Sequence, residues 1–121
     1  MKLKQLGLDF SVCQIKSVRE VDFSRTYVFL SQTDEELSLV CETASVPGDA
    51  TAVENGWKGL KIEGVLDFSM IGVISKISGI LADNNISIFV ISTYNTDYIF
   101  LKAEWYNQAV ALLRQAAYTI R

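Results

Sequence analysis

Histidine is absent from this chain of 121 residues, which contains two cysteines, Cys13 and Cys41. Without histidine the chain lacks the commonest general base and the usual imidazole metal ligand. Two distant cysteines cannot complete a four-ligand zinc site. Both lie in apolar, strand-like runs, where a cysteine usually packs as a small hydrophobic residue. We therefore expect no metal and no cofactor, and a structural role for both cysteines in preference to redox chemistry.

A catalytic constellation is also missing. No nucleophile stands near an evident base, and neither a Walker loop nor a dinucleotide-binding loop occurs. The arginine and asparagine phosphate site of acylphosphatases, which share the ferredoxin-like fold predicted below, is absent. The sequence therefore predicts a protein that is not an enzyme and has no catalytic residues.

Long apolar runs and basic clusters are absent as well. No stretch is long enough to cross a membrane, and residues 1–9 have no apolar core of secretory length. The net charge is −3, and the eleven basic residues are scattered from Lys2 to Arg121. No phosphate-tracking face can be identified from that distribution. We expect a cytoplasmic protein with neither a membrane nor a nucleic acid as partner.

The most informative segment runs from Glu63 to Leu101. After a strand end and a polar loop it contains a predicted helix, whose apolar residues recur at helical spacing on one face: Met70, Ile74, Ile77 and Leu81. Ser69 is the natural N-cap, and Asp67 adds a negative charge near the positive end of the helix dipole. Residues 83–85 are expected to end the helix.

A strand, a turn and a returning strand follow the helix. Residues 86–94 are β-branched and aromatic and too apolar to be half buried, which predicts a central strand. Residues 95–97 supply turn chemistry, and residues 98–103 return as the antiparallel partner. A second helix presents one apolar face, and residues 118–120 could form a last edge strand. The residues on that helix face are Trp105, Ala109, Leu112, Leu113 and Ala116.

With residues 57–63 as the first strand, the order is βαββαβ, which is an α+β, ferredoxin-like sandwich. Its two helices cover one face of the sheet. In the strand from Ile86, however, Ile88 and Val90 point one way and Phe89 and Ile91 the other, and all are apolar. Half of all residues are hydrophobic, more than a small monomer requires. We therefore expect the uncovered face to be buried, and a homodimer.

The first half of the chain resembles a reduced version of the second. It contains strand-like runs at residues 8–15, 26–31 and 37–42, and residues 46–54 could hold a short helix. Residues 8–11 read Leu-Asp-Phe-Ser, as do residues 66–69, and a Thr-Asp pair marks the tip of each predicted hairpin. We therefore predict two related units packed together, residues 1–56 and residues 57–121.

Several short motifs carry a family resemblance. They are Glu63-Gly64, Leu66-Asp67-Phe68-Ser69 with Gly72 close behind, and the strand-turn-strand from Ile88 to Ile99. With these motifs residues 64–118 resemble an ACT domain, of the kind found in small bacterial ACT proteins. The animal cytosolic arginine sensors and the regulatory part of aspartate kinases are more distantly similar. The resemblance implies an ACT fold and an amino acid bound where two modules meet.

Ligand contacts are expected around the start of the first helix. Free amides between Ser69 and Gly72 suit a carboxylate, and Gly72 would let a ligand approach closely. Asp67 and Asp97 are the carboxylates available for an ammonium group. The plainer interpretations are that Asp67 and Ser69 only cap the helix and that Asp97 only forms the turn.

Phe68 and Thr93 complete the candidate site. Phe68 could close over a ligand or fill the core, and filling the core is the commoner role of such an aromatic. Thr93 could contact a ligand, but β-branched residues are common in strands anyway. Two functions stay open: a non-catalytic regulatory protein that binds an amino acid between ACT-like units, or an interaction module that dimerises through its sheets without an effector.

Overall fold

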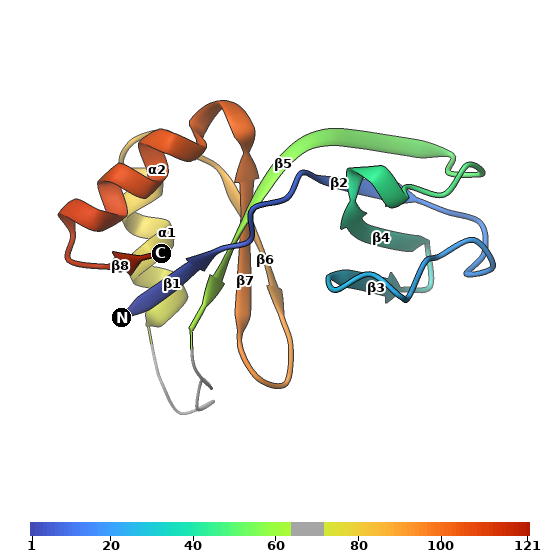
Figure 1. The fold of residues 1–121 in the computed structure, drawn as a ribbon, viewed down its shortest axis with the longest axis horizontal. Coiled ribbons are helices and arrows are strands. Elements are labelled where there is room, and N and C mark those ends of the chain that lie inside the picture. The colour runs from blue at the N-terminus through green and yellow to red at the C-terminus, as the bar shows by residue number, and fades with distance from the viewer. Residues whose placement is uncertain (64–71) are drawn as a thin grey trace. The chain divides into compact units, whose positions relative to one another are not determined.

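The computed structural model of the chain describes residues 1–63 and 72–121. The chain divides into two compact units (Figure 1). Unit 1 consists of Met1–Gly7 and Lys58–Arg121, and unit 2 is Leu8–Trp57. Strand β5 (Ala52–Ile62) contributes its first residues to unit 2 and its last residues to unit 1.

Unit 1 has the predicted α+β, ferredoxin-like architecture. Along the chain, β5 is followed by α1 (Val73–Ala82), β6 (Ile88–Ser92), β7 (Asp97–Lys102), α2 (Ala103–Gln115) and β8 (Thr119–Ile120). This is the expected order βαββαβ. Glu104 in the first turn of α2 and Arg114 in its last turn stand at the helix ends that the dipole favours for their charges.

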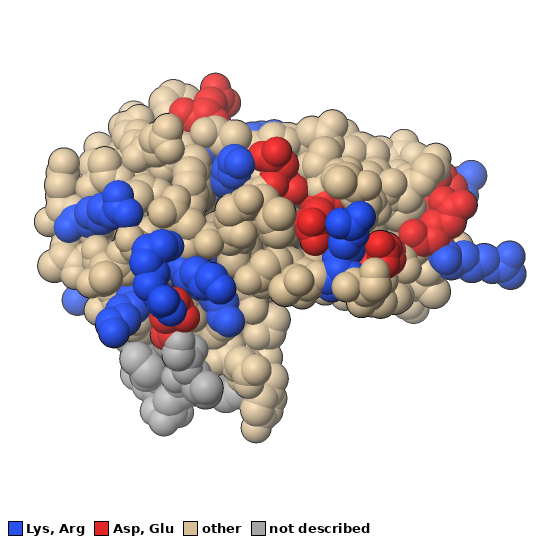
Figure 2. Space-filling model, viewed as in Figure 1, with Lys and Arg blue, Asp and Glu red and all other residues tan. Residues whose placement is uncertain are grey.

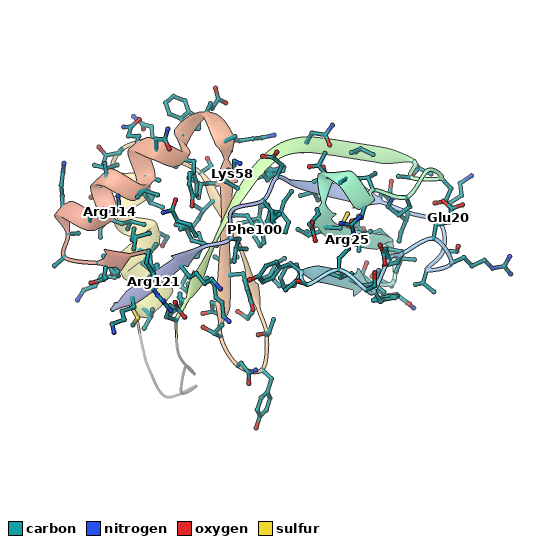
Figure 3. All side chains as sticks on the ribbon, in the orientation of Figure 1. Glu20, Arg25, Lys58, Phe100, Arg114 and Arg121 are labelled. Atoms are coloured by element: carbon teal, nitrogen blue, oxygen red, sulfur yellow. The ribbon has the colours of Figure 1, made fainter. Side chains whose placement is uncertain are left out.

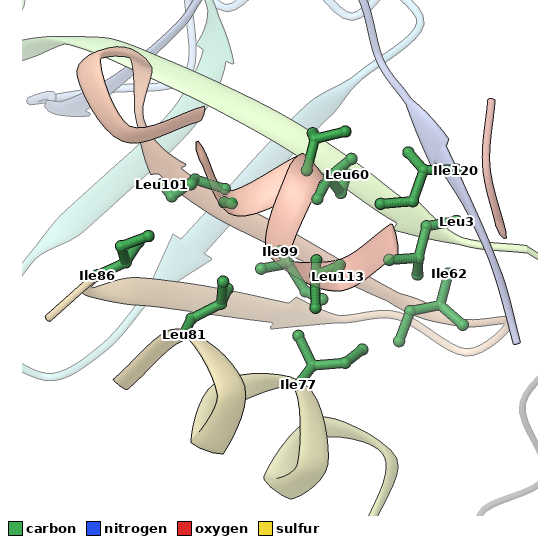
Figure 4. Packing of buried hydrophobic residues seen from close by; sticks show 12 residues of the cluster. Leu3, Leu60, Ile62, Ile77, Leu81, Ile86, Ile99, Leu101, Leu113 and Ile120 are labelled. Atoms are coloured by element: carbon green, nitrogen blue, oxygen red, sulfur yellow. The ribbon is translucent and has the colours of Figure 1, made fainter. Parts of the chain in front are cut away.

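One hydrophobic core lies between the two helices and one face of the unit 1 sheet (Figure 4). Leu60 and Ile62 of β5 belong to this core, so Lys61 between them points to the opposite face. The other members come from β1, α1, β7, α2 and β8 and from Ile86 just before β6, and they are nearly or fully buried: Leu3, Ile77, Leu81, Ile86, Ile99, Leu101, Ala109, Val110, Leu113 and Ile120.

The sheet of unit 1 contains a strand that the sequence did not predict. Strand β1 (Lys2–Gln5) lies between β5 and β8, which gives the order β6-β7-β5-β1-β8. It runs antiparallel to β5, with Leu3 opposite Ile62, and parallel to β8, with Leu3 opposite Ile120. The sequence supplied only four strands because residues 2–5 are mostly polar and contain a single core residue, Leu3.

Helix α1 begins later than predicted. Its N-cap is Gly72, whose φ of 83° lies in the left-handed region and cannot continue into a right-handed helix. The expected cap Ser69 and the expected first core residue Met70 lie outside the described residues. Ile77 and Leu81 are the buried residues of the helix, as their spacing predicted.

The prediction that β6 is a central strand is wrong for the described part of the chain, where β6 pairs with β7 alone. Its apolar composition has another cause. Ile88 and Val90 pack against the core below the helices, while Phe89 stacks on Phe100 of β7 on the other face, with ring centroids 5.0 Å apart. An edge strand can therefore be apolar on both faces.

Unit 2 is a smaller antiparallel sheet. Its strands are β2 (Phe10–Gln14), β3 (Val28–Gln32), β4 (Leu37–Glu42) and the first part of β5, in the order β3-β4-β2-β5. One face carries a small core of Cys13, Ile15, Leu39 and Cys41. A single 3₁₀ turn, η1 (Thr43–Ser45), follows β4.

The short helix expected in residues 46–54 is absent from this described segment. Residues 46–51 form turns, and from Ala52 the chain pairs with β2, with Ala52 opposite Gln14 and Val53 opposite Cys13. Pairing with β2 satisfies the backbone groups that a helix would otherwise bond internally. This long-range pairing makes the segment from Ala52 a strand and not a helix, and it could not be predicted from the local sequence.

Candidate functional site

Several segments of unit 1 meet at one end of its sheet, which we call the loop end. Glu63 follows β5 there, and its N–H donates to Lys2 O at 2.9 Å. Thr119 N–H donates to Met1 O at 3.1 Å. The turn between β6 and β7 lies at the same end (Figure 1), tied to β5 by a hydrogen bond from Thr96 Oγ1 to Ile62 O of 2.8 Å. The loop end thus joins residues that are far apart in the sequence.

Gly72 precedes helix α1 at the loop end and has a backbone conformation that favours glycine. Its carbonyl accepts the N–H of Lys76 at 2.9 Å, which closes the first turn of α1. As a glycine it has no side chain, and it makes no side-chain cap hydrogen bond to the first amides of the helix. A Cβ on Gly72 would meet nothing within 4 Å, so the positive φ is what requires glycine here.

A cavity of about 700 Å³ opens beside the start of α1. Its described lining comes from Met1 before β1, from α1 with its N-cap, and from the turn between α2 and β8: Met1, Gly72, Val73, Lys76, Ile80, Ala116, Ala117 and Tyr118. Among the described residues of this lining, Lys76 has the one charged side chain, and most of the others are apolar. Cavities that bind small molecules have this size and this mixture of apolar walls with few polar groups. The cavity can therefore accept a small anionic molecule with an apolar part.

The turn between β6 and β7 is built by its two threonines. Thr93 Oγ1 donates to Thr96 O at 2.9 Å and accepts the N–H of Thr96 at 3.3 Å. Thr96 is 3 % exposed, and its hydroxyl is the group that binds Ile62 O. Both hydroxyls are therefore engaged in holding the turn and attaching it to β5.

Asp97 follows this turn as the first residue of β7 and is half-buried. It was expected either to hold an ammonium group or to form the turn through its side chain. The hydrogen bonds that shape the described turn come from Thr93 and Thr96. The carboxylate of Asp97 is thus not needed to build the turn.

The structure distributes the predicted site residues unevenly. Gly72 lines the cavity, whereas Thr93 and Asp97 belong to the β6–β7 turn and are not part of the lining. Asp67, Phe68 and Ser69 lie outside the described residues. Sequence reasoning missed Lys76, although it follows Gly72 by one helical turn, and it missed Tyr118 and Thr96, whose positions depend on strand pairing.

Arg121 and Glu63 form an ion pair at the loop end. Arg121 Nε donates to Glu63 Oε1 at 2.9 Å, and the side chain of Arg121 extends from the last residue of the chain (Figure 3). The Arg121 side chain is 71 % exposed and that of Glu63 is 19 % exposed. Because the arginine is largely exposed, this pair contributes little stability, roughly 0–1 kcal/mol. It does set the position of the Glu63 carboxylate on the sheet face opposite the helices.

The two thiols lie side by side in the core of unit 2. Cys13 and Cys41 are free cysteines on the neighbouring strands β2 and β4. Burial, together with the adjacent Cys41, raises the pKa of Cys13 to about 11, and burial also raises the pKa of Cys41. Both are therefore neutral thiols near pH 7, which disfavours nucleophilic or metal-binding roles. Across residues 1–63 and 72–121, no group of three potential ligands is placed to hold a metal ion.

None of the helices in the described residues is long and apolar enough to span a membrane. Fold and cavity together define the class of the protein: a ferredoxin-like α+β domain with a cavity of ligand size at the loop end of its sheet.

Residues 52–115 match the family model described as ACT domain, which covers more than half of the chain. The chain belongs to the ACT domain family. ACT domains are regulatory, non-catalytic modules, so membership indicates a regulatory, ligand-binding role. No curated protein sequence gives a significant match.

Solved structures agree on the fold. A protein from Agrobacterium tumefaciens has a TM-score of 0.88 and 27% sequence identity, over 99% of this chain and 91% of that chain. A Vibrio cholerae protein of unknown function, titled a possible transport protein, has a TM-score of 0.71 and 21% identity, over 92% and 85% of the two chains. The regulatory subunit of aspartate kinase from Thermus thermophilus has a TM-score of 0.58 and 11% identity, over 89% and 91%. The last two, at these identities, show likeness of fold alone.

Proposed function

We propose that this protein is a non-catalytic regulatory protein that binds a small ligand, an amino acid, at an interface between ACT-like units. The observation that carries the proposal is the cavity beside α1, which is lined both by Gly72 at the helix N-terminus and by Lys76. Both groups favour an anion, because amides and the positive end of the helix dipole act together with the lysine charge.

An amino acid fits the chemistry of this cavity. Its carboxylate would take the first amides of α1 and Lys76, and its side chain would lie against Val73, Ile80 and Tyr118. Its ammonium needs an acceptor, and we assign that role to Asp97, whose carboxylate is not used in the described turn. Asp97 is not part of the described cavity lining, and in this proposal the ligand lies between ACT-like units.

The same proposal includes a homodimer. The described part of β6 pairs on one side only, and its open edge can pair with the β6 of a second copy. Phe89 and Ile91 are half-buried on the sheet face away from the helices and would gain burial in such a pair. We further propose that the N-terminal half is a reduced ACT-like unit. The adjacent free thiols Cys13 and Cys41 suit a reducing compartment, and we place the protein in the cytoplasm.

A second candidate function is an interaction module without an effector. It is favoured by the Thr93 hydroxyl, which is already used within the turn, so that one predicted ligand contact is taken by the fold itself.

A thermal-shift screen with the twenty amino acids separates the two functions. A ligand at 100 times its dissociation constant should stabilise the protein by about 2.7 kcal/mol. Lys76→Gln should weaken binding of that ligand, and Asp97→Asn should do the same while leaving the fold intact. Lys16→Gln in unit 2 is the matched control and should bind normally. If no amino acid raises the melting temperature, the interaction module is the correct function.

A further inference from the structure

Charge is divided unequally between the two units. Unit 2 contains nine acidic and three basic residues, a net charge of −6, whereas unit 1 contains eight basic and five acidic residues, a net charge of +3. These values account for the total of −3. A chain whose parts carry opposite charges can be attracted to a second copy of itself although its net charge would repel that copy.

The excess positive charge of unit 1 includes a cluster on one sheet face, which we call the basic face: Lys2, Lys4, Lys61 and Arg121. Leu3, Ile62 and Ile120 point to the helices, so by alternation the neighbouring residues of β1 and β5 point to the other face. Arg121 continues the pairing of β8 with β1, because its N–H donates to Leu3 O at 3.1 Å. Figure 2 shows basic side chains gathered over β1 and the C-terminal end.

Two of these lysines repel each other in the described sheet. Lys4 and Lys61 are direct partners in the pairing of β1 with β5. Like charges directly opposite each other on an antiparallel pair are destabilising. Glu63 is engaged with Arg121 and therefore offsets one of the four positive charges. The basic face thus retains charge that an external carboxylate could neutralise.

Unit 2 carries a complementary surface on the face of its sheet opposite the Cys13 core. A shallow cavity of about 460 Å³ is lined there by Glu36 and Glu54, together with Gln14 and with Ser38, whose hydroxyl donates to Glu36 Oε1. Glu54 lies opposite Val12 of β2, and Glu36 ends the turn that enters β4. Two carboxylates in the lining of a cavity of this size suit the ammonium groups of two lysines.

We propose that the basic face of unit 1 docks on the Glu36 and Glu54 surface of unit 2 in a second copy of this chain. Among the described residues no carboxylate forms an ion pair with Lys4 or Lys61, and the partner copy supplies these carboxylates. A second copy fits better than a nucleic acid, because the −6 charge of unit 2 would repel a polyanion and attracts the basic face. The contact is independent of any ligand in the α1 cavity and of pairing through the edge of β6.

Salt sensitivity distinguishes this contact from backbone pairing at β6. Sedimentation velocity in low salt should show self-association that weakens by about tenfold or more in 0.5 M salt, where exposed charges are screened. Lys4→Glu with Lys61→Glu should abolish the salt-sensitive step, and so should Glu36→Lys with Glu54→Lys. Thermal melting of each variant establishes that it is folded.

Mixing the two charge-reversed double variants is the most direct test of the proposal. An equimolar mixture of the two double variants restores both charge pairings and should recover the salt-sensitive association. Lys16→Glu with Arg19→Glu changes the net charge by the same amount as the lysine variant, but on an exposed loop of unit 2, and should not weaken association. Failure of the mixture to associate, or equal weakening in this control, would overturn the proposal. Binding of the native chain to a DNA oligonucleotide, lost in the lysine variant, would assign the basic face to nucleic acid instead.

Discussion

Gly59 of β5 stands where the sheet of unit 1 leaves no room for a side chain. A Cβ at this position would lie 2.7 Å from Leu6 Cδ1 and 2.9 Å from Phe100 Cε1. Phe100 is fully buried and labelled in Figure 3, and its ring is stacked on Phe89, so it cannot retreat freely. Gly79 in α1 is different, because a Cβ there would meet nothing within 4 Å. Steric exclusion therefore requires glycine at position 59 but not at position 79.

At the scale of the residue, we predict that Gly59→Ala lowers the free energy of unfolding by about 1–3 kcal/mol, because the added methyl overpacks the buried ring. Gly79→Ala is the matched control and should raise it by about 0.5–1 kcal/mol through the higher helix propensity of alanine. Urea denaturation of both variants measures these changes. Equal stability of Gly59→Ala and the native chain would show that Leu6 and Phe100 can move aside at no cost.

At the scale of the element, β6 has one paired and one open side in the described chain. Thr93 N–H donates to Thr96 O at 2.9 Å, so the backbone of Thr93 points toward the returning chain. Backbone groups alternate along an antiparallel strand, which directs the N–H of Ser92 away from β7. Ser92 is exposed and is therefore the position where the edge can be blocked without disturbing the hairpin.

We therefore predict that Ser92→Pro retains the fold but loses the proposed pairing of β6 between copies. Proline is tolerated on an edge strand when its missing N–H would have faced outward. Ser92→Ala removes the same hydroxyl and keeps the N–H, so it should still dimerise. Light scattering in high salt, where the charged contact is screened, measures the mass of each variant. A dimer that persists in Ser92→Pro would exclude the edge of β6 as the interface.

At the scale of the whole molecule, unit 1 is assembled from both ends of the chain. Its sheet is completed by β1, which comes from the first residues and lies between β5 and β8. Leu3 is fully buried and is the residue through which β1 enters the core. Folding of unit 1 therefore requires a contact between residues almost 120 positions apart in the sequence, since Leu3 pairs with Ile120.

Leu3→Ala should accordingly destabilise the protein by about 2–5 kcal/mol, the usual effect of leaving a cavity in a packed core. Lys2→Ala, the exposed neighbour on the same strand, should change stability by no more than about 0.5 kcal/mol. Chemical denaturation monitored by tryptophan fluorescence, to which Trp57 and Trp105 both contribute, tests the difference. If Leu3→Ala and Lys2→Ala proved equally stable, β1 would not be an integral strand of unit 1.

Much of unit 1 was predictable because its signals are local. The spacing of Ile77 and Leu81 reports a helix face, and the alternation of Leu60, Lys61 and Ile62 reports a strand with one buried side. Each pattern depends on residues within a few positions of one another. These local periods were enough to determine the βαββαβ order and the fold class.

Three features depend on contacts between distant residues and are visible only in the tertiary structure: strand β1, the cavity beside α1 and the basic face. A strand with one core residue, Leu3, has no period to detect, and its place is set by pairing with β5 and β8. The cavity combines Lys76 with Tyr118, and the basic face combines Lys4 with Lys61, although neither pair is close in the sequence. Strand pairing is chosen by the total free energy of contacts between separated segments, and the sequence of any one segment contains only its own half of each contact.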